Sequence, residues 1–503
     1  MDFLENLFSL PPLLYAPLVV GSLCLVFNYL VYSRRVAQWR KSNIPFLTPS
    51  FLIGHKYFWG VGSNSNKDKD LVAFFIATMP VVLLRKPALI KQIFAKNFDE
   101  AFKTGCVVDD ASTPHLLSQS PDKSLWKAHR NALSPMFATT RLSGEGFAKI
   151  RSHIAHMSAH VEEARLRGKP INMREVRNFT HFLALNDNSY EKKGELRKFL
   201  ESFTEPGWGR LLKVFAQLYL RGVTKWESLQ FITKKQIESM RSLLQKQMVQ
   251  RNQTGDNEND LIGLLTRLKE QDRDMKLDSE MDVTNEMISL GLSLLLGGLK
   301  GQLSVDNMMS FTMHLLSLYP EYQERIRQEV EEVMVKHKTT EFTYEVVRDL
   351  HFLNQCLRET ARLYPNTSAL SRVCTEDFTP AGTNYNFKKG ERIIVDPYSI
   401  HRDPEYFENP DVFDPDRFSP KNRDSKSIDA FLGFGKGPRK CPGNNVGLLI
   451  ASTMIGSLVH KYEVRPHSHK KQMDAYDFHP RSFAIVHKND VLVNLMPRAI
   501  LAH

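Results

Sequence analysis

Cysteine is scarce in this chain, and so is any segment that would separate domains. Only five cysteines occur among 503 residues, with no Cys-x-x-Cys spacing. This odd, small number excludes a disulfide scaffold and places the bulk of the chain in a reducing compartment. No internal repeat and no long Gly/Ser-rich or Pro-rich linker occurs. Although the length exceeds the roughly 250–300 residues of a single core, these absences favour one large domain, residues 34–503, after a short N-terminal segment, residues 1–33.

The chain also lacks an acidic excess, because its formal net charge is +11. A basic protein can bind nucleic acid, anionic lipid or an acidic protein. The basic residues are scattered, and no nucleic-acid-binding motif accompanies them. We therefore expect a lipid surface or an acidic partner protein, and no nucleic acid.

The stretch from Leu7 to Tyr32 contains no charged side chain. Its length suffices for a membrane-crossing helix, which needs ~20 apolar residues. Acidic residues precede it, and four basic residues follow it, namely Arg34, Arg35, Arg40 and Lys41. The positive-inside rule then places the rest of the chain in the cytosol. A cleaved signal peptide is the alternative, but it has a basic start and a shorter apolar core. The sequence predicts one retained transmembrane helix.

A glycine-rich loop surrounds Cys441. Four glycines and two prolines crowd around this cysteine, and three basic residues accompany them, at Lys436, Arg439 and Lys440. Glycines allow unusual backbone conformations and close approach to a bulky planar group, while prolines stiffen the loop. Basic neighbours lower the cost of a negative sulfur. A thiolate held in this way suits ligation of iron; the plain alternative is a turn with an incidental cysteine.

The pattern Phe434-x-x-Gly437-x-Arg439-x-Cys441-x-Gly443 resembles the cysteine-loop signature of the cytochrome P-450 family. The resemblance implies a mainly α-helical cytochrome P-450 fold with a small β-rich lobe. It also implies haem b (iron protoporphyrin IX) between a central helix and the cysteine loop. Cys441 would be the axial iron ligand, with Phe434, Arg439 and Gly443 as further cofactor-binding residues.

Two further stretches match the haem-binding segments of the family. Trp126-Lys-Ala-His-Arg130 resembles its early haem-binding helix, in which Trp126 and Arg130, four residues apart, share a face. Arg372 follows Leu363-Tyr-Pro at the place where the family uses an arginine to bind a haem propionate. A guanidinium pairs well with a carboxylate. The resemblance therefore implies that Trp126, Arg130, Arg372 and Arg439 hold the propionates.

Structural motifs of the family follow in the expected order. Glu359-Thr-Ala-Arg362 lies in a segment whose apolar residues suit a packed helix. The family joins such a pair to a later arginine, which here is Arg417. We interpret His401, in His401-Arg-Asp-Pro404, as structural and not as a second iron ligand. We expect strands mainly at Met79–Leu84, Ile393–Val395 and Phe483–Leu495.

The central helix departs from the family pattern. Most members carry an acid and an alcohol there, which help to deliver protons during oxygen activation. The expected helix, residues 283–317, has Ser304 in place of the alcohol and Leu303 in place of the acid. A register based on Gly297-Gly298 also lacks an acid, and Asp306 lies ~200° around the helix from Ser304. Either protons pass through Ser304 and water, or the reaction does not need this relay.

The resemblance implies a monooxygenase that inserts one oxygen atom from O₂ into a lipophilic small molecule. Electrons would come from NADPH through a reductase carrying FAD and FMN, at the endoplasmic reticulum membrane. Basic residues around Cys441 and Arg130 would suit an acidic docking partner. The apolar patch Leu211–Leu220, with basic flanks, either dips into the bilayer or is a buried helix. An oxygen-independent isomerase or dehydratase of peroxides, which needs no reductase, and a haem-binding protein with little catalysis are the alternatives.

Overall fold

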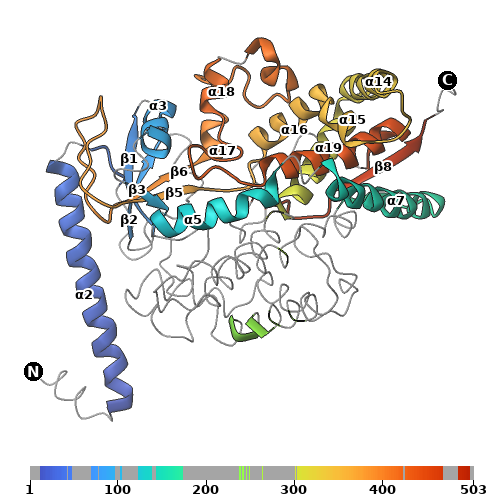
Figure 1. Ribbon diagram of the computed structural model, residues 1–503. Coiled ribbons are helices and arrows are strands. Elements are labelled where there is room, and N and C mark those ends of the chain that lie inside the picture. Colours follow the sequence, from blue (N-terminus) through green and yellow to red (C-terminus); the bar gives the residue numbers. More distant parts are fainter. Residues whose placement is uncertain are drawn as a thin grey trace, which may run out of the picture. The chain divides into compact units, whose positions relative to one another are not determined.

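The computed structural model describes most of the chain's second half and selected parts of its first half. The described residues are 12–41, 44–47, 69–76, 79–96, 102–104, 123–138, 143–173, 303–422, 425–467 and 485–498, with a few single residues elsewhere. They belong to two compact units. The first unit comprises residues 1–112, 207–231 and 371–396, and the second comprises residues 113–206, 232–370 and 397–503. The described part is mostly helical with small sheets (Figure 1), as predicted.

The described residues of the first unit form a five-stranded sheet. Its order is β1 (Leu71–Ile76), β2 (Met79–Leu84), β6 (Arg392–Val395), β5 (Leu370–Cys374) and β3 (Phe102–Thr104). β1 and β2 pair antiparallel, whereas β2 pairs parallel with β6, which lies far away in the sequence. Most of the paired positions hold β-branched residues, such as Val82 opposite Ile393, and these two are fully buried. The strands predicted at Met79–Leu84 and Ile393–Val395 are confirmed.

Helical segments complete the described part of this unit. Helix α2 (Pro12–Lys41) covers most of the predicted anchor and continues beyond it, while α3 (Pro87–Lys91) and the π-helical turn η2 (Gln92–Lys96) follow β2. Near the end of α2, Trp39 is buried, and its ring lies 5.0 Å from that of Phe75 on β1.

The structure does not confirm a membrane-spanning helix in the predicted anchor. Among the residues that the structure describes, no helix combines the length and hydropathy that crossing a bilayer requires. Residues 1–11 lie outside that part. The predicted domain boundary at residue 33 falls within α2. The transmembrane helix is therefore not confirmed, and the division into residues 1–33 and 34–503 stays a prediction.

The second unit contains most of the described helices. They are α5 (Lys123–Leu133), η3 (Ser134–Phe137), α7 (Glu145–Leu166), a central helix over 303–318, α14 (Pro320–Lys336), α15 (Tyr344–Arg348), α16 (His351–Leu363), α17 (Pro397–Ile400), η9 (Pro415–Phe418), η10 (Pro420–Asn422), α18 (Lys426–Ala430) and α19 (Asn444–Lys461). A small antiparallel sheet has the order β4 (Ile171–Asn172), β8 (Leu492–Pro497) and β7 (Tyr462–Pro466). β8 is shorter than the strand predicted over Phe483–Leu495, of which residues 483 and 484 lie outside the described part.

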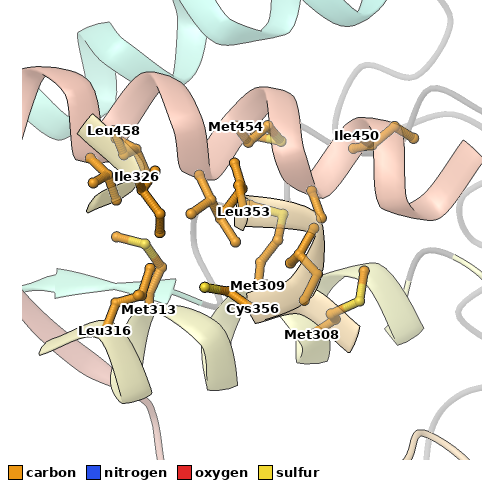
Figure 2. Close-up of a cluster of buried hydrophobic side chains, with 14 of the residues drawn as sticks. Met308, Met309, Met313, Leu316, Ile326, Leu353, Cys356, Ile450, Met454 and Leu458 are labelled. Atoms are coloured by element: carbon orange, nitrogen blue, oxygen red, sulfur yellow. The ribbon is translucent and has the colours of Figure 1, made fainter. Parts of the chain in front are cut away.

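The core of this unit forms where the central helix, α16 and α19 meet (Figure 2). Met309 and Met313 from the central helix, Leu353 and Cys356 from α16, and Met454 from α19 are all buried in one cluster. α19 is apolar around most of its circumference, which is typical of a helix enclosed by protein. Burial of apolar surface, worth about 25 cal/mol per Å², therefore holds these three helices together.

Candidate functional site

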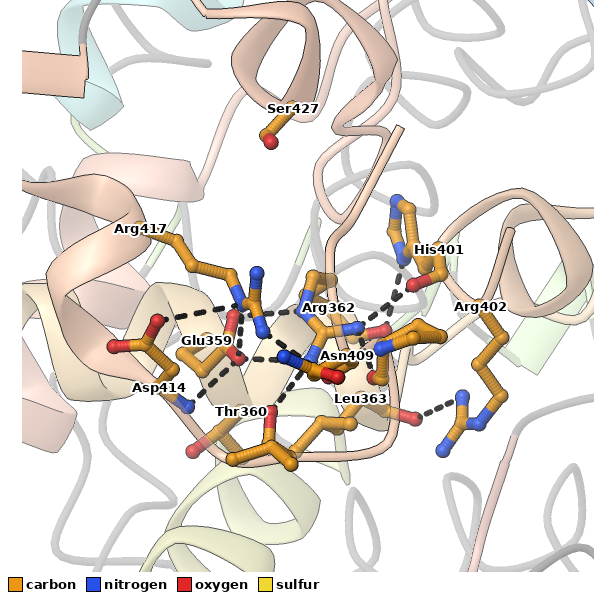
Figure 3. Close-up of polar contacts among 12 residues, drawn as sticks. Glu359, Thr360, Arg362, Leu363, His401, Arg402, Asn409, Asp414, Arg417 and Ser427 are labelled. Atoms are coloured by element: carbon orange, nitrogen blue, oxygen red, sulfur yellow. Dashed lines mark hydrogen bonds and ion pairs between the residues drawn. The ribbon is translucent and has the colours of Figure 1, made fainter. Parts of the chain in front are cut away.

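A buried ion network lies at the C-terminal end of α16 (Figure 3). Glu359 and Arg362 are fully buried, and Arg362 Nε and Nη2 donate to the two Glu359 carboxylate oxygens, each at 2.7 Å. Arg417 Nε donates to Glu359 Oε1 at 3.3 Å. The expected joining of Arg417 to this pair is therefore confirmed. A buried charge pair is tolerable only when its remaining donors and acceptors are satisfied.

Backbone carbonyls satisfy the rest of the Arg362 guanidinium. Nη1 donates to the carbonyl oxygens of His401 and Pro410, both at 2.7 Å, and Nη2 donates to that of Val412 at 3.1 Å. One side chain on α16 thus fixes the path of the chain that follows β6. The network is structural, because both Glu359 carboxylate oxygens already accept hydrogen bonds within the protein.

His401 connects the ion network to the cysteine loop. The Leu432 backbone N–H donates to His401 Nε2 at 2.8 Å, so Nδ1 carries the proton and donates to the Arg362 carbonyl oxygen at 2.9 Å. The ring is fully buried and stacks on Phe431, with centroids 5.5 Å apart. Both ring nitrogens are used within the protein. The interpretation of His401 as structural is confirmed.

Acid should weaken the fold through His401. Burial first, and the charge of Arg362 second, lower the pKa of His401 from 6.5 to about 3. The unfolded chain therefore binds more protons between these values, so the stability that the neutral ring provides is complete above pH 6.5 and is lost as the pH falls toward 3. We expect a loss on the order of 2 kcal/mol between pH 7 and pH 5. Urea unfolding of the wild type and His401→Gln tests this, because a steeper or equal pH dependence in the variant contradicts it.

The cysteine loop has a tightly bonded backbone. Cys441 N donates to the Phe434 carbonyl oxygen at 2.8 Å, and this hydrogen bond joins the two sides of the loop. Gly435 and Gly437 both have φ of +76°, a conformation that glycine adopts without strain. At Gly433 a Cβ atom would come within 2.5 Å of the Phe431 ring. Gly433, Gly435 and Gly437 therefore each have a specific steric role, whereas Gly443 has a φ of −84°, which any residue can adopt.

The Cys441 sulfur lies just before the N-terminus of α19. The residue retains exposed surface, yet surrounding protein atoms remove enough water to raise the pKa of its thiol. The backbone N–H groups of Gly443 and Asn444 and the charge of Arg130 act in the opposite direction and favour the thiolate. The Gly443 amide is thus brought to the sulfur, while its predicted role in binding the cofactor stays a prediction.

A cation from outside the cysteine loop favours the thiolate. Lys436 is engaged elsewhere, since its Nζ donates to the Asp429 backbone carbonyl oxygen and lies 3.3 Å from Asp429 Oδ1. Lys440 is exposed. The positive charge acts instead from Arg130 on α5, a distant segment of the chain. This corrects the expectation for Lys436, and Arg130 is one of the cations that the resemblance to the family places at the haem.

Helix α5 brings a tryptophan and an arginine to the same loop. Trp126 is buried, and the Arg439 guanidinium lies over its ring at 4.3 Å from the centroid. Arg130 Nη2 donates to the Lys440 carbonyl oxygen at 3.1 Å. Burial first, and repulsion from Arg130 second, lower the pKa of Arg439 to about 10. Two guanidinium groups that repel each other beside an accessible thiol suit an iron cofactor that carries carboxylates, as haem b does.

Arg372 belongs to the first unit, on β5. It is buried, its guanidinium lies 4.0 Å over the Phe94 ring, and its Nη1 donates to the Ser371 carbonyl oxygen at 2.8 Å. Its pairing partner on β3 is Thr104. A propionate-binding role for Arg372 stays a prediction.

The central helix approaches the start of α19 near Ser304. A Cβ atom at Gly447 would lie 3.4 Å from Val305 Cγ2, the residue after Ser304. Ser304 is half-buried, and its carbonyl oxygen accepts a hydrogen bond from Asn366 Nδ2 at 3.0 Å. Asp306 is buried. Lys300, Gln302 and the alternative register at Gly297-Gly298 lie outside the described residues, as does the patch 211–220.

Comparison with known proteins gives the family. Residues 40–492 match the sequence model of the Cytochrome P450 family. The chain belongs to the cytochrome P450 family. Relatives include cytochrome P450 6k1 of Blattella germanica, 25% identical over 489 residues that cover 89% of this chain and 91% of the relative. Cytochrome P450 6B7 of Helicoverpa armigera is 26% identical over 514 residues, which cover 97% of this chain and 99% of the relative.

Family membership confirms the coarse predictions. Cytochromes P450 are haem-thiolate oxidoreductases, typically monooxygenases, so this P450 is an oxidoreductase whose family implies haem as cofactor. Three of the predicted cofactor residues, Trp126, Arg130 and Arg439, meet beside Cys441 in the second unit. The Phe434 carbonyl oxygen accepts the hydrogen bond from Cys441 N that joins the two sides of the loop. Sequence reasoning did not anticipate the contact between Asn366 and Ser304, which lie 62 residues apart in the sequence.

Proposed function

We propose that this P450 is a monooxygenase that inserts one oxygen atom from O₂ into a lipophilic small molecule. Two electrons would come from NADPH through a reductase that carries FAD and FMN. The observation that carries the proposal is the accessible Cys441 thiol beside Arg130, with the amides of Gly443 and Asn444 directed to the sulfur. Cys441 would ligate the haem iron, and Trp126, Arg130, Arg372 and Arg439 would hold the propionates.

Bound haem supplies the oxygen-activating chemistry, and the protein's residues position and tune it. The His401–Leu432 bond and the Cys441–Phe434 bond keep the loop in a fixed conformation, which holds the sulfur at one place. The Ser304 hydroxyl would pass protons from water on the central helix. Arg130 and Arg439 would neutralise the carboxylates of the cofactor.

One observation favours a second candidate function. Leu303 occupies the position at which most members of the family have an acid, and an apolar side chain cannot take part in proton delivery. An isomerase or dehydratase that rearranges a hydroperoxide needs neither that acid nor a reductase. A haem-binding protein with little catalysis is the third possibility.

Turnover assays separate these functions. With NADPH and reductase, the wild-type protein should oxidise lipophilic probe substrates and consume O₂, and omission of the reductase should stop the reaction. Fatty-acid hydroperoxides should not be isomerised when NADPH is absent. Rapid rearrangement of a hydroperoxide without reductase, with no NADPH-dependent oxidation of any probe, would establish the second function instead. A normal reduced-CO spectrum with neither activity would point to the third.

We also place this P450 at the endoplasmic reticulum membrane, with its catalytic domain in the cytosol. Support comes from the uncharged stretch Leu7–Tyr32 and the basic residues after it. Large apolar side chains on α2 are exposed, namely Val26, Phe27, Tyr29 and Leu30, and lipid would cover them. Alkaline carbonate extraction of microsomes tests the proposal, because release of the full chain into the supernatant would exclude an integral anchor.

A further inference from the structure

The segment after α16 is attached to one face of the central helix at two points. Ser304 and Phe311 are seven residues apart, almost two full helical turns, so they lie on the same face. The Tyr364 ring stacks on that of Phe311, with centroids 4.3 Å apart and planes 18° from parallel. Asn366 Nδ2 donates to the Ser304 carbonyl oxygen at 3.0 Å. Tyr364 and Asn366 therefore fix this face over two turns.

The second polar atom of the Asn366 amide is also buried. Its Oδ1 accepts no hydrogen bond from any residue in the described part of the chain. A buried acceptor without a donor costs about 1–3 kcal/mol. Such atoms are normally satisfied by an ordered water or by a ligand. The site of this atom is next to the turn that carries Ser304.

The geometry points to Asn366 as a positioning residue for proton delivery through Ser304, an inference that rests on the proposed monooxygenase function. Nδ2 fixes the turn of the central helix that carries Ser304. Oδ1 accepts a hydrogen bond from a water molecule, which supplies protons to the Ser304 hydroxyl. Water is thereby held by a neighbouring segment, although the central helix offers only Leu303 where an acid is usual. Asn366 holds the water and does not itself gain or lose a proton.

The test compares Asn366→Leu with the neighbouring control Thr367→Val. Leucine has a similar size but removes both amide contacts, whereas the Thr367 hydroxyl donates only to the Ala369 carbonyl oxygen. For Asn366→Leu we expect the product formed per NADPH to fall about tenfold, with hydrogen peroxide released in its place. Turnover driven by added hydroperoxide, the reduced-CO spectrum and the substrate dissociation constant should stay within twofold of the wild type. The control should match the wild type throughout.

The Asn366→Asp variant adds a pH readout. A protonated carboxyl can donate to the Ser304 carbonyl oxygen as the amide does, whereas the carboxylate cannot. The product formed per NADPH should therefore rise toward the wild-type value as the pH falls, while the wild type and Thr367→Val lack this trend.

Several results would overturn the inference. An unchanged ratio of product formed to NADPH consumed in Asn366→Leu excludes it. An equal loss of NADPH-driven and hydroperoxide-driven turnover also excludes it, because that result indicates a purely structural role. Weakened substrate binding with unchanged coupling places substrate, and not water, at Oδ1. Failure of the proposed function is distinguishable, because then the wild type itself forms no product from NADPH.

Discussion

The Cys441→Ser variant should lose the red-shifted Soret band that thiolate-ligated haem gives in its reduced, CO-bound form, and NADPH-driven turnover should fall below detection. A serine hydroxyl stays protonated near neutral pH and does not replace a thiolate as iron ligand. Cys356 and Cys374 are buried, whereas Cys441 is exposed. Absorption spectroscopy of the purified protein, with haem content measured separately, checks the expectation.

The matched control is Cys374→Ser. The Cys374 thiol donates to the Glu376 carbonyl oxygen at 2.7 Å, a bond that serine can also make. This variant should keep the spectrum and the activity of the wild type. An unchanged Soret band in Cys441→Ser would mean that the iron is held elsewhere, and the assignment of the whole site would then fail.

The Arg362→Leu variant should lose about 3–5 kcal/mol of unfolding free energy, the usual cost of removing one partner from a buried ion pair. Glu359 would keep a buried charge whose remaining donors are Arg417, at 3.3 Å, and the Asp414 backbone N–H, at 3.0 Å, and three backbone carbonyl oxygens would lose their donor. Most natural domains are stable by only about 5–15 kcal/mol. We therefore expect poor yield or a large decrease in the urea midpoint, measured by circular dichroism.

Two comparisons make this result specific. Arg465→Gln removes an exposed partner of Glu463 and should change the unfolding free energy very little, because water and salt screen this pair. The double variant Glu359→Gln with Arg362→Leu removes both charges, so it should be more stable than Arg362→Leu alone. Equal losses in Arg362→Leu and Arg465→Gln would contradict the view that the buried network clamps the fold.

Local patterns made several elements predictable. The apolar spacing before Glu359 predicts α16, and a short continuous apolar run predicts β2, because both elements are shaped mainly by neighbouring residues. The glycines of the cysteine loop were likewise readable, since a positive φ at Gly437 is a local requirement. The Glu359–Arg417 contact was predictable only through the resemblance to the family.

Long-range contacts set the limit of sequence reasoning. Arg130 acts on Cys441 because α5 packs beside the cysteine loop, an arrangement that was predictable only through the resemblance to the family. Asn366 lies 62 residues from Ser304, and an asparagine after a proline is otherwise typical of a plain turn. Lys436 does not stabilise the thiolate as predicted, because the fold of the loop pairs it with Asp429 instead.

The parallel pairing of β2 with β6 has a consequence for biosynthesis. β1 and β2 can form a hairpin soon after they leave the ribosome, but Val82 must wait for Ile393, which is made much later. During that delay the open edge of β2 offers unpaired backbone groups to other nascent chains, which is a known route to aggregation. Completion of this sheet is thus a late event, and a chain that stops before β6 would expose that edge permanently.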